Sequence, residues 1–115
     1  MSDTHVDRKV LSDLQEVMED EYIKLLETFL EDSEMRLNRL CRARDVDDLG
    51  REAHSFKGSA SNMGAHRLAE LCRQVEERVS QRLPFGIEPL IGQICREYKE
   101  VRQVFRDECE RVKVS

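Results

Sequence analysis

Apolar residues recur every three or four positions along most of this chain, and this spacing predicts helices. A short helix is expected over residues 8–18, followed by a long helix to about residue 43 with Asp20 as its cap. A second long helix should begin near Asp45 or Asp47 and end at Gly64. A third long helix should end before residues 83–86, which interrupt the helical pattern. A fourth long helix should carry Pro89 in its first turn. The predicted core positions are Val10, Leu11, Leu14, Val17, Ile23, Leu26, Leu30, Leu37, Leu40, Leu49, Ala53, Phe56, Ala60, Met63, Leu68, Leu71, Cys72, Val75, Val79, Ile91, Ile94, Tyr98, Val101, Phe105 and Val112.

Four amphipathic helices joined by short links predict an all-α fold, an antiparallel four-helix bundle. The short helix over residues 8–18 would cap one end of the bundle. No segment alternates with the period of a strand, and no hairpin signal occurs. We expect a single domain over residues 1–115, with residues 1–6 as a frayed N-terminus.

The charge of the chain narrows the classes of partner. The net charge is −5, and 37% of the residues are charged. Binding to nucleic acid or to an anionic membrane requires a concentrated basic face, so neither partner is expected. No long uncharged apolar run occurs, and the four cysteines form no CxxC motif. We therefore expect a cytoplasmic monomer with reduced thiols and no bound metal.

One face of the helix after Asp45 combines three residues of unusual chemistry. His54, Lys57 and Gly58 stand at positions i, i+3 and i+4, which lie about 5–6 Å apart on one helical face. This face lies away from the apolar stripe, so His54 is expected outside the core. Glycine inside a helix costs about 1 kcal/mol relative to alanine, and Gly58 therefore suggests that a large partner approaches closely. Gly50 is better explained by helix packing.

A nucleophilic nitrogen, a cation and open space are what reversible phosphorylation of histidine needs. The run from Ala53 to Gly64 resembles the signature of histidine-containing phosphotransfer (HPt) domains. The following helix and the run from Tyr22 to Asp32 also resemble that family, so the resemblance covers about residues 10–110. It implies a stand-alone histidine phosphotransfer protein of a multistep two-component phosphorelay.

The resemblance also implies a role for individual residues. His54 would accept a phosphoryl group from a receiver-domain aspartate on its distal ring nitrogen, and would pass it to a response-regulator aspartate. Lys57 would stabilise the phosphate, and Gly58 would leave steric access for the receiver. Glu76 stands where relatives often carry a glutamine that reaches the histidine, and it is a candidate for orienting the ring.

The remaining expectations concern weaker contacts and the partners. Ser55 and Ser61 are candidates for hydrogen bonding near the imidazole, although serine inside a helix often bonds its own backbone. Val10, Leu14 and Tyr22 are candidates for docking receiver domains of hybrid sensor kinases and of a response regulator. Mg²⁺ is expected on the partner receiver domain, and no cofactor on this chain. Without a nucleotide-binding or kinase motif, the chain is interpreted as a phosphocarrier and not an enzyme.

Two other functions fit a helical bundle. The first is a non-catalytic adaptor that binds a signalling partner without phosphotransfer. The second is a metal-dependent bundle, which would need inward-facing Glu-x-x-His pairs; the spacing of Glu52 and His54 does not match. His5 is expected in the terminal tail and His66 on the surface.

Overall fold

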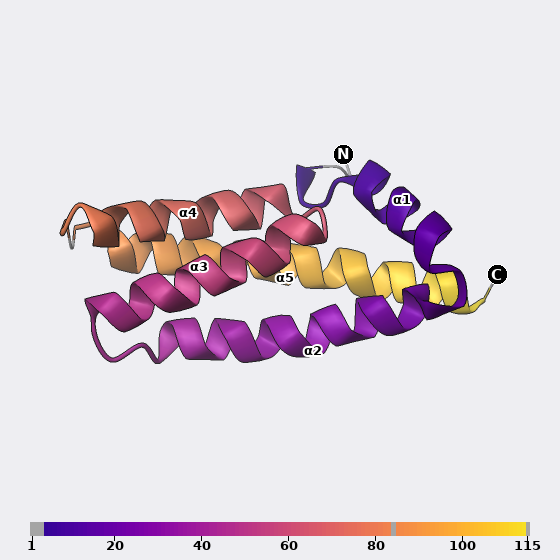
Figure 1. Ribbon diagram of the computed structural model, residues 1–115, viewed down its shortest axis with the longest axis horizontal. Coiled ribbons are helices and arrows are strands. Elements are labelled where there is room, and N and C mark those ends of the chain that lie inside the picture. Colours follow the sequence, from indigo (N-terminus) through magenta and orange to yellow (C-terminus); the bar gives the residue numbers. More distant parts are fainter. Residues whose placement is uncertain (1–3, 84, 115) are drawn as a thin grey trace.

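The computed structural model describes residues 4–83 and 85–114 (Figure 1). All regular structure in these residues is helical, which confirms the predicted all-α class. The helices are α1 (Arg8–Met18), α2 (Tyr22–Cys41), α3 (Val46–Asn62), α4 (His66–Ser80) and α5 (Ile87–Lys113), with a single 3-10 turn, η2 (Glu19–Glu21), between α1 and α2.

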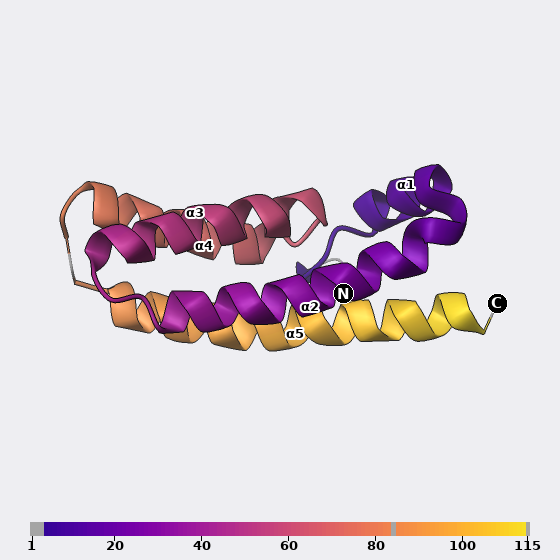
Figure 2. The ribbon, with the colours of Figure 1, turned by 60° about the horizontal axis from the view of Figure 1, so that its bottom comes forward.

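The four long helices form the predicted antiparallel bundle. Helix α3 packs against α2 and α4, and α5 packs against the same two helices from the other side. Figures 1 and 2 show that each helix runs opposite to its neighbours. Helices α2 and α5 extend beyond the α3–α4 pair at one end, and α1 lies over that end. The prediction that the short helix caps the bundle is therefore confirmed.

The predicted apolar stripes form the core. Phe56, Tyr98 and Phe105 are fully or almost fully buried, and the rings of Phe29 and Phe105 lie 4.6 Å apart between their centroids. One prediction about α1 is wrong. Val17 is 77% exposed, because it faces solvent while Leu14 and Met18 on the same helix pack against the core. Ser33 interrupts the apolar stripe of α2 but is fully buried, since its hydroxyl bonds that of Tyr98 at 2.8 Å.

The ends of α3 determine where His54 lies in the bundle. The Asp48 N–H donates to Asp45 Oδ1 at 2.8 Å, so Asp45 is the N-cap, as predicted. Gly64 follows the helix with φ +83°, a left-handed conformation that favours glycine. The corresponding prediction for Asp20 is wrong. Asp20 lies within η2, and α2 begins at Tyr22 without a side-chain cap.

The N-terminal segment is more ordered than expected. Residues 1–3 lie outside the described residues, but the expectation of a frayed end is wrong for His5 and Val6. Val6 is fully buried, and His5 Nδ1 lies 2.9 Å from Glu97 Oε2 on α5. The Asp7 N–H donates to the Gly64 carbonyl at 2.9 Å. The segment before α1 is thus attached both to α5 and to the turn between α3 and α4.

A buried carboxylate connects α1, α2 and α5. Glu108 is 4% exposed, and Tyr22 donates to it at 2.6 Å. Arg111 donates to the same carboxylate at 2.8 and 3.0 Å, and Arg8 at 3.3 Å. Hydrogen bonds from Arg111 outweigh the burial of Glu108 and hold the pKa of this carboxyl below its usual value. Because Tyr22 is fully buried, the prediction that it docks partners is wrong.

The Glu108 cluster predicts a specific pH dependence of stability. Its depressed pKa means that the charged contacts stabilise the fold above the unfolded-state value of about 4.5, and that this contribution is lost as the pH falls further. Glu108→Gln should lower the free energy of unfolding by about 1.5–3 kcal/mol at pH 7. Urea unfolding should show that the difference in free energy of unfolding between wild type and Glu108→Gln becomes smaller below about pH 4.5. The control is Glu110→Gln, which changes an exposed carboxylate of α5. If this difference in free energy of unfolding stayed constant with pH, the charge of Glu108 would have no stabilising role.

Candidate functional site

The candidate site is centred on His54, in the middle of α3. Leu49, Ala53 and Phe56 face the core from the same helix. The His54 side chain points the other way and is 71% exposed. The prediction that this histidine lies outside the core is therefore confirmed, and its ring is accessible to a reactant from solvent.

A carboxylate on α4 joins His54 to Lys57. Glu76 Oε2 lies 2.7 Å from His54 Nδ1, and Glu76 Oε1 lies 2.7 Å from Lys57 Nζ. Glu76 is 23% exposed and Lys57 33% exposed, so both are more shielded than the imidazole. We call these three residues the His54–Glu76–Lys57 cluster. The sequence predicted each member, and the structure brings all of them together across the α3–α4 interface.

Glu76 is held in its charged form. Partial burial favours the neutral acid, but contacts with the Lys57 ammonium and the His54 ring outweigh it and keep the pKa of Glu76 below its usual value. Beneath it, burial raises the pKa of the Cys72 thiol to about 12, and the charge of Glu76 acts in the same direction. The carboxylate is thus the charged acceptor of the cluster, and Cys72 is a protonated, buried thiol.

The contact with Glu76 distinguishes the two ring nitrogens of His54. A carboxylate only accepts hydrogen bonds, so the neutral ring must carry its proton on Nδ1. The lone pair then lies on Nε2. The arrangement therefore presents an exposed nitrogen nucleophile whose orientation and proton position are set by the neighbouring helix.

The two glycines of α3 have different surroundings. A Cβ added to Gly58 would meet no atom within 4 Å, so this position is open space beside the cluster. A Cβ on Gly50 would lie 3.0 Å from Val79 Cγ1 on α4. The expectation that Gly50 serves helix packing agrees with this contact, whereas Gly58 serves no packing purpose among the residues that the structure describes.

Comparison with known proteins identifies the family. A sequence model described as the Hpt domain matches residues 24–113. This chain belongs to the Hpt domain family. Proteins of this family are phosphocarriers and not kinases, and they interact with receiver domains of response regulators and kinases.

Two solved structures resemble this Hpt protein. The histidine-containing phosphotransfer protein B (HptB) from Pseudomonas aeruginosa PAO1 is 47% identical, with a TM-score of 0.90 over 94% of this chain and 96% of that chain. A putative histidine-containing phosphotransfer protein from rice is 17% identical, with a TM-score of 0.81 over 95% of this chain and 82% of that chain. The rice protein supports the fold alone. A search of curated proteins gives no match.

Shallow hollows flank the cluster in this Hpt protein. One of about 480 Å³ is lined by His54, Glu76, Asp47, Gly50 and Val79, and by Arg51 and Ser80, which the sequence pattern did not single out. The other, of about 380 Å³, is lined by Lys57, Gly58, Ser61, Asn62, His66, Ala69, Glu70 and Arg73. Arg51 and Asp47 precede His54 by three and seven residues. Helical periodicity alone would therefore have placed both of them on the same face as His54.

The other candidate residues lie farther from the imidazole. Arg36 on α2 donates to the Ser55 hydroxyl, so Ser55 contacts the α2 side of α3. Ser61 is exposed beside Gly58, in the hollow that does not contain His54. Val10 and Leu14 are half-buried on α1, and Val10 lies against the turn at Gly64. The structure thus brings Glu76 to His54 but not these four residues.

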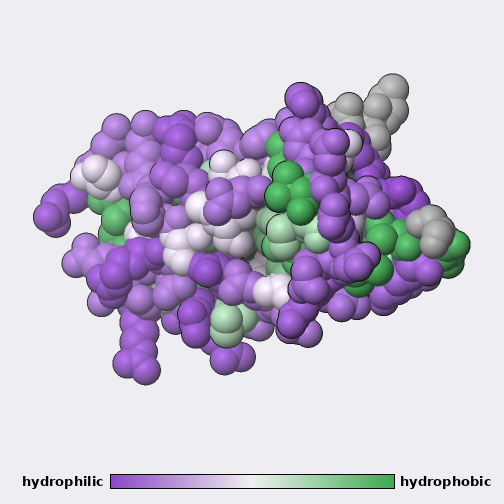
Figure 3. Space-filling view, turned by 45° about the vertical axis from the view of Figure 1, so that its right-hand side comes forward, coloured by the Kyte–Doolittle hydropathy of each residue, from purple (hydrophilic) through white to green (hydrophobic). Residues whose placement is uncertain are grey.

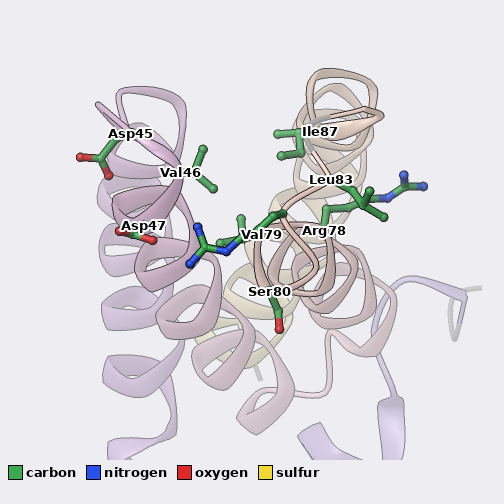
Figure 4. Close-up of a pocket in the computed structure, with 9 residues that line it drawn as sticks. Asp45, Val46, Asp47, Arg78, Val79, Ser80, Leu83 and Ile87 are labelled. Atoms are coloured by element: carbon green, nitrogen blue, oxygen red, sulfur yellow. The ribbon is translucent and has the colours of Figure 1, made fainter.

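Two further surface features do not include His54, Glu76 or Lys57. A hollow of about 660 Å³ at the far end of the bundle is lined by Asp45, Val46, Asp47, Arg78, Val79, Ser80, Arg82, Leu83 and Ile87 (Figure 4). Figure 3 shows a mostly hydrophilic surface with apolar atoms gathered near α1. In the described part of the chain, no helix is long and apolar enough to cross a membrane.

The contrast between the two glycines gives a stability test. Gly58→Leu should raise the free energy of unfolding by about 0.5–1 kcal/mol, because leucine is the better helix former and meets open space. Gly50→Leu should lower it by about 1–3 kcal/mol, since the new side chain collides with Val79. Chemical denaturation of both variants beside wild type measures the difference. Equal effects of the two substitutions would contradict the difference in packing between these positions.

Proposed function

We propose that this protein carries phosphoryl groups on Nε2 of His54 between aspartates of two receiver domains. One observation carries the proposal: Nε2 is the free nitrogen of an exposed imidazole whose Nδ1 is held by Glu76 at 2.7 Å. Membership of the Hpt domain family supports the class of reaction. The residue and the nitrogen are inferred from the geometry of the cluster.

The transfer step requires little covalent chemistry from the protein. The Nε2 lone pair attacks the phosphorus of an aspartyl phosphate, the N–P bond forms, and the P–O bond to the aspartate carboxylate breaks. The ring keeps its Nδ1 proton and becomes a positively charged imidazolium hydrogen-bonded to Glu76. The second receiver reverses the step, because its aspartate attacks phosphorus and the electron pair returns to Nε2. Positioning and charge neutralisation account for most of such catalysis.

Lys57 supplies a cation on the helical face that carries His54. Opposite unit charges about 4 Å apart interact by about 1 kcal/mol in water and about 4 kcal/mol near a protein surface. Lys57 is one-third exposed, so its net effect lies at the low end of this range. We therefore expect Lys57 to tune the lifetime and transfer rate of phosphohistidine without being indispensable.

The partner contributes the remaining parts of the reaction. A receiver domain would bring both the aspartate and the Mg²⁺ that neutralises the phosphoryl oxygens. Gly58 would leave room for its approach, since that position is open to at least 4 Å. Val10 and Leu14 remain proposed docking residues on α1.

Phosphate transfer onto wild type and His54→Gln tests the assignment. Incubation with labelled, phosphorylated receiver domains and Mg²⁺ should label the wild type with an acid-labile, alkali-stable phosphate. His54→Gln should take up no label, because it lacks the nucleophile. His66→Gln, which changes an exposed histidine on α4, should be labelled like wild type.

The other outcomes lead to different conclusions. Label on His54→Gln would mean that another residue carries the phosphate. A folded wild type that accepts no label from several receivers would favour the non-catalytic adaptor instead.

The role of Gly58 is tested by comparing a large and a small phosphodonor. Gly58→Leu should reduce phosphorylation by a receiver domain at least about tenfold, because the side chain fills the space that a macromolecular partner needs. Phosphorylation of the same variant by phosphoramidate, a small donor, should change less than about twofold. The initial rates of both reactions, followed by phosphorus NMR, give the comparison. Equal losses with both donors would show that Gly58 does not act through steric access.

A further inference from the structure

The cation expected to neutralise the phosphoryl group is already paired. Lys57 Nζ lies 2.7 Å from Glu76 Oε1, an oxygen that is shielded from solvent. The same carboxylate accepts the Nδ1 proton of His54 through Oε2. Glu76 is therefore the shared partner of both groups that phosphorylation would change.

We propose that Glu76 and the phosphoryl group on His54 compete for the Lys57 ammonium, and that this competition limits the stability of the phosphohistidine. The inference rests on the proposed function, since it concerns the state in which His54 carries phosphate. It assigns Glu76 the role of a positioning residue that acts through Lys57 and through the ring proton.

The charges in the two states support this competition. The form of the ring that acts as a nucleophile is neutral, and in that form the charges of Glu76 and Lys57 balance each other. Phosphorylation places a group of charge about −1.5 to −2 on Nε2, while Nδ1 keeps its proton and the ring becomes positive. Glu76 then has a cationic partner in the ring, and the phosphoryl group attracts the cations on its own face: Lys57, and the exposed Arg51, which lies 3.4 Å from Asp48.

The side chains differ in their freedom to move. Lysine carries its charge on a flexible four-carbon stem with three donors, so Lys57 is able to contact a new acceptor on the same helical face. Glu76 Oε1 is inaccessible to solvent, and withdrawing the ammonium would leave this oxygen without a polar contact, while Oε2 keeps its contact with the ring. This cost opposes complete transfer of Lys57 to the phosphoryl group. The cluster therefore keeps the phosphoryl group less stabilised than a free lysine would, as suits a carrier that must release it.

Substitution by glutamine separates charge from orientation. Glu76→Gln keeps a side chain of the same length whose carbonyl oxygen accepts the Nδ1–H, but it removes the negative charge that competes for Lys57. Lys57→Gln removes the contested cation. The matched control is Glu77→Gln, which removes a carboxylate one position along α4 that contacts Arg73 at 3.5 Å instead.

The experiment measures how long phosphohistidine survives in each protein. Wild type, the three single variants and the Glu76→Gln/Lys57→Gln double variant are phosphorylated with phosphoramidate, the donor is removed, and the phosphohistidine signal is followed by phosphorus NMR. In its decay, water attacks phosphorus, the N–P bond breaks and inorganic phosphate is released. Circular dichroism confirms that each variant is folded.

We expect Glu76→Gln to lengthen the half-life about 2- to 5-fold, as removal of a partly exposed ion pair implies. Lys57→Gln should shorten the half-life, and the shortening should be larger in the Glu76→Gln background than in wild type. Glu77→Gln should leave the half-life unchanged.

Two failures remain distinguishable. Equal effects of Lys57→Gln in both backgrounds, on proteins that do become phosphorylated, would overturn the competition but not the phosphocarrier function. A wild type that takes up no phosphate at His54 would contradict the proposed function and the competition together.

Discussion

The site depends on the close approach of α3 and α4. At Gly50 there is so little space that an added Cβ would lie 3.0 Å from Val79. Ala53 and Ala60 are also fully buried, so the face of α3 that enters the bundle carries several small side chains. Small residues let two helix backbones approach, and a glutamate on α4 is then able to reach an imidazole on α3. Bulkier residues at these positions would hold the two helices farther apart. Glu76 would then no longer reach His54 at 2.7 Å.

Most of the fold was predictable because its helices follow simple periodicity. The stripe through Leu49, Ala53 and Phe56 placed α3 correctly and put His54 on a different face, outside the core. The errors arose where long-range contacts override local signals. Val6 looked like part of a tail, but it is fully buried, and its neighbours His5 and Asp7 contact α5 and the α3–α4 turn. Asp20 had the chemistry of a cap, but the chain forms a 3-10 turn at that point and α2 begins without a capping side chain.

The candidate site was predictable only in part, since its members lie on two helices. The positions of His54, Lys57 and Gly58 follow from spacing within one helix, which a sequence displays directly. The proximity of Glu76 was suggested by resemblance to a family, and spacing alone does not reveal a contact between residues 22 positions apart. The contacts of the buried Glu108 were even harder to predict from the sequence. Tyr22 looked like a docking residue. Nothing in the sequence indicates that its hydroxyl donates a hydrogen bond to Glu108, 86 positions later.

The division of the cluster between two helices has a consequence for any attempt to isolate it. A peptide covering residues 46–62 would contain the entire histidine, lysine and glycine motif. Even if it folded as a helix, it would lack the carboxylate that selects one ring nitrogen. Its imidazole would exchange freely between tautomers, and its lysine would have no competing partner. The motif alone therefore does not form the site. Transplanting it onto another scaffold requires a second helix that places a hydrogen-bond acceptor beside the histidine.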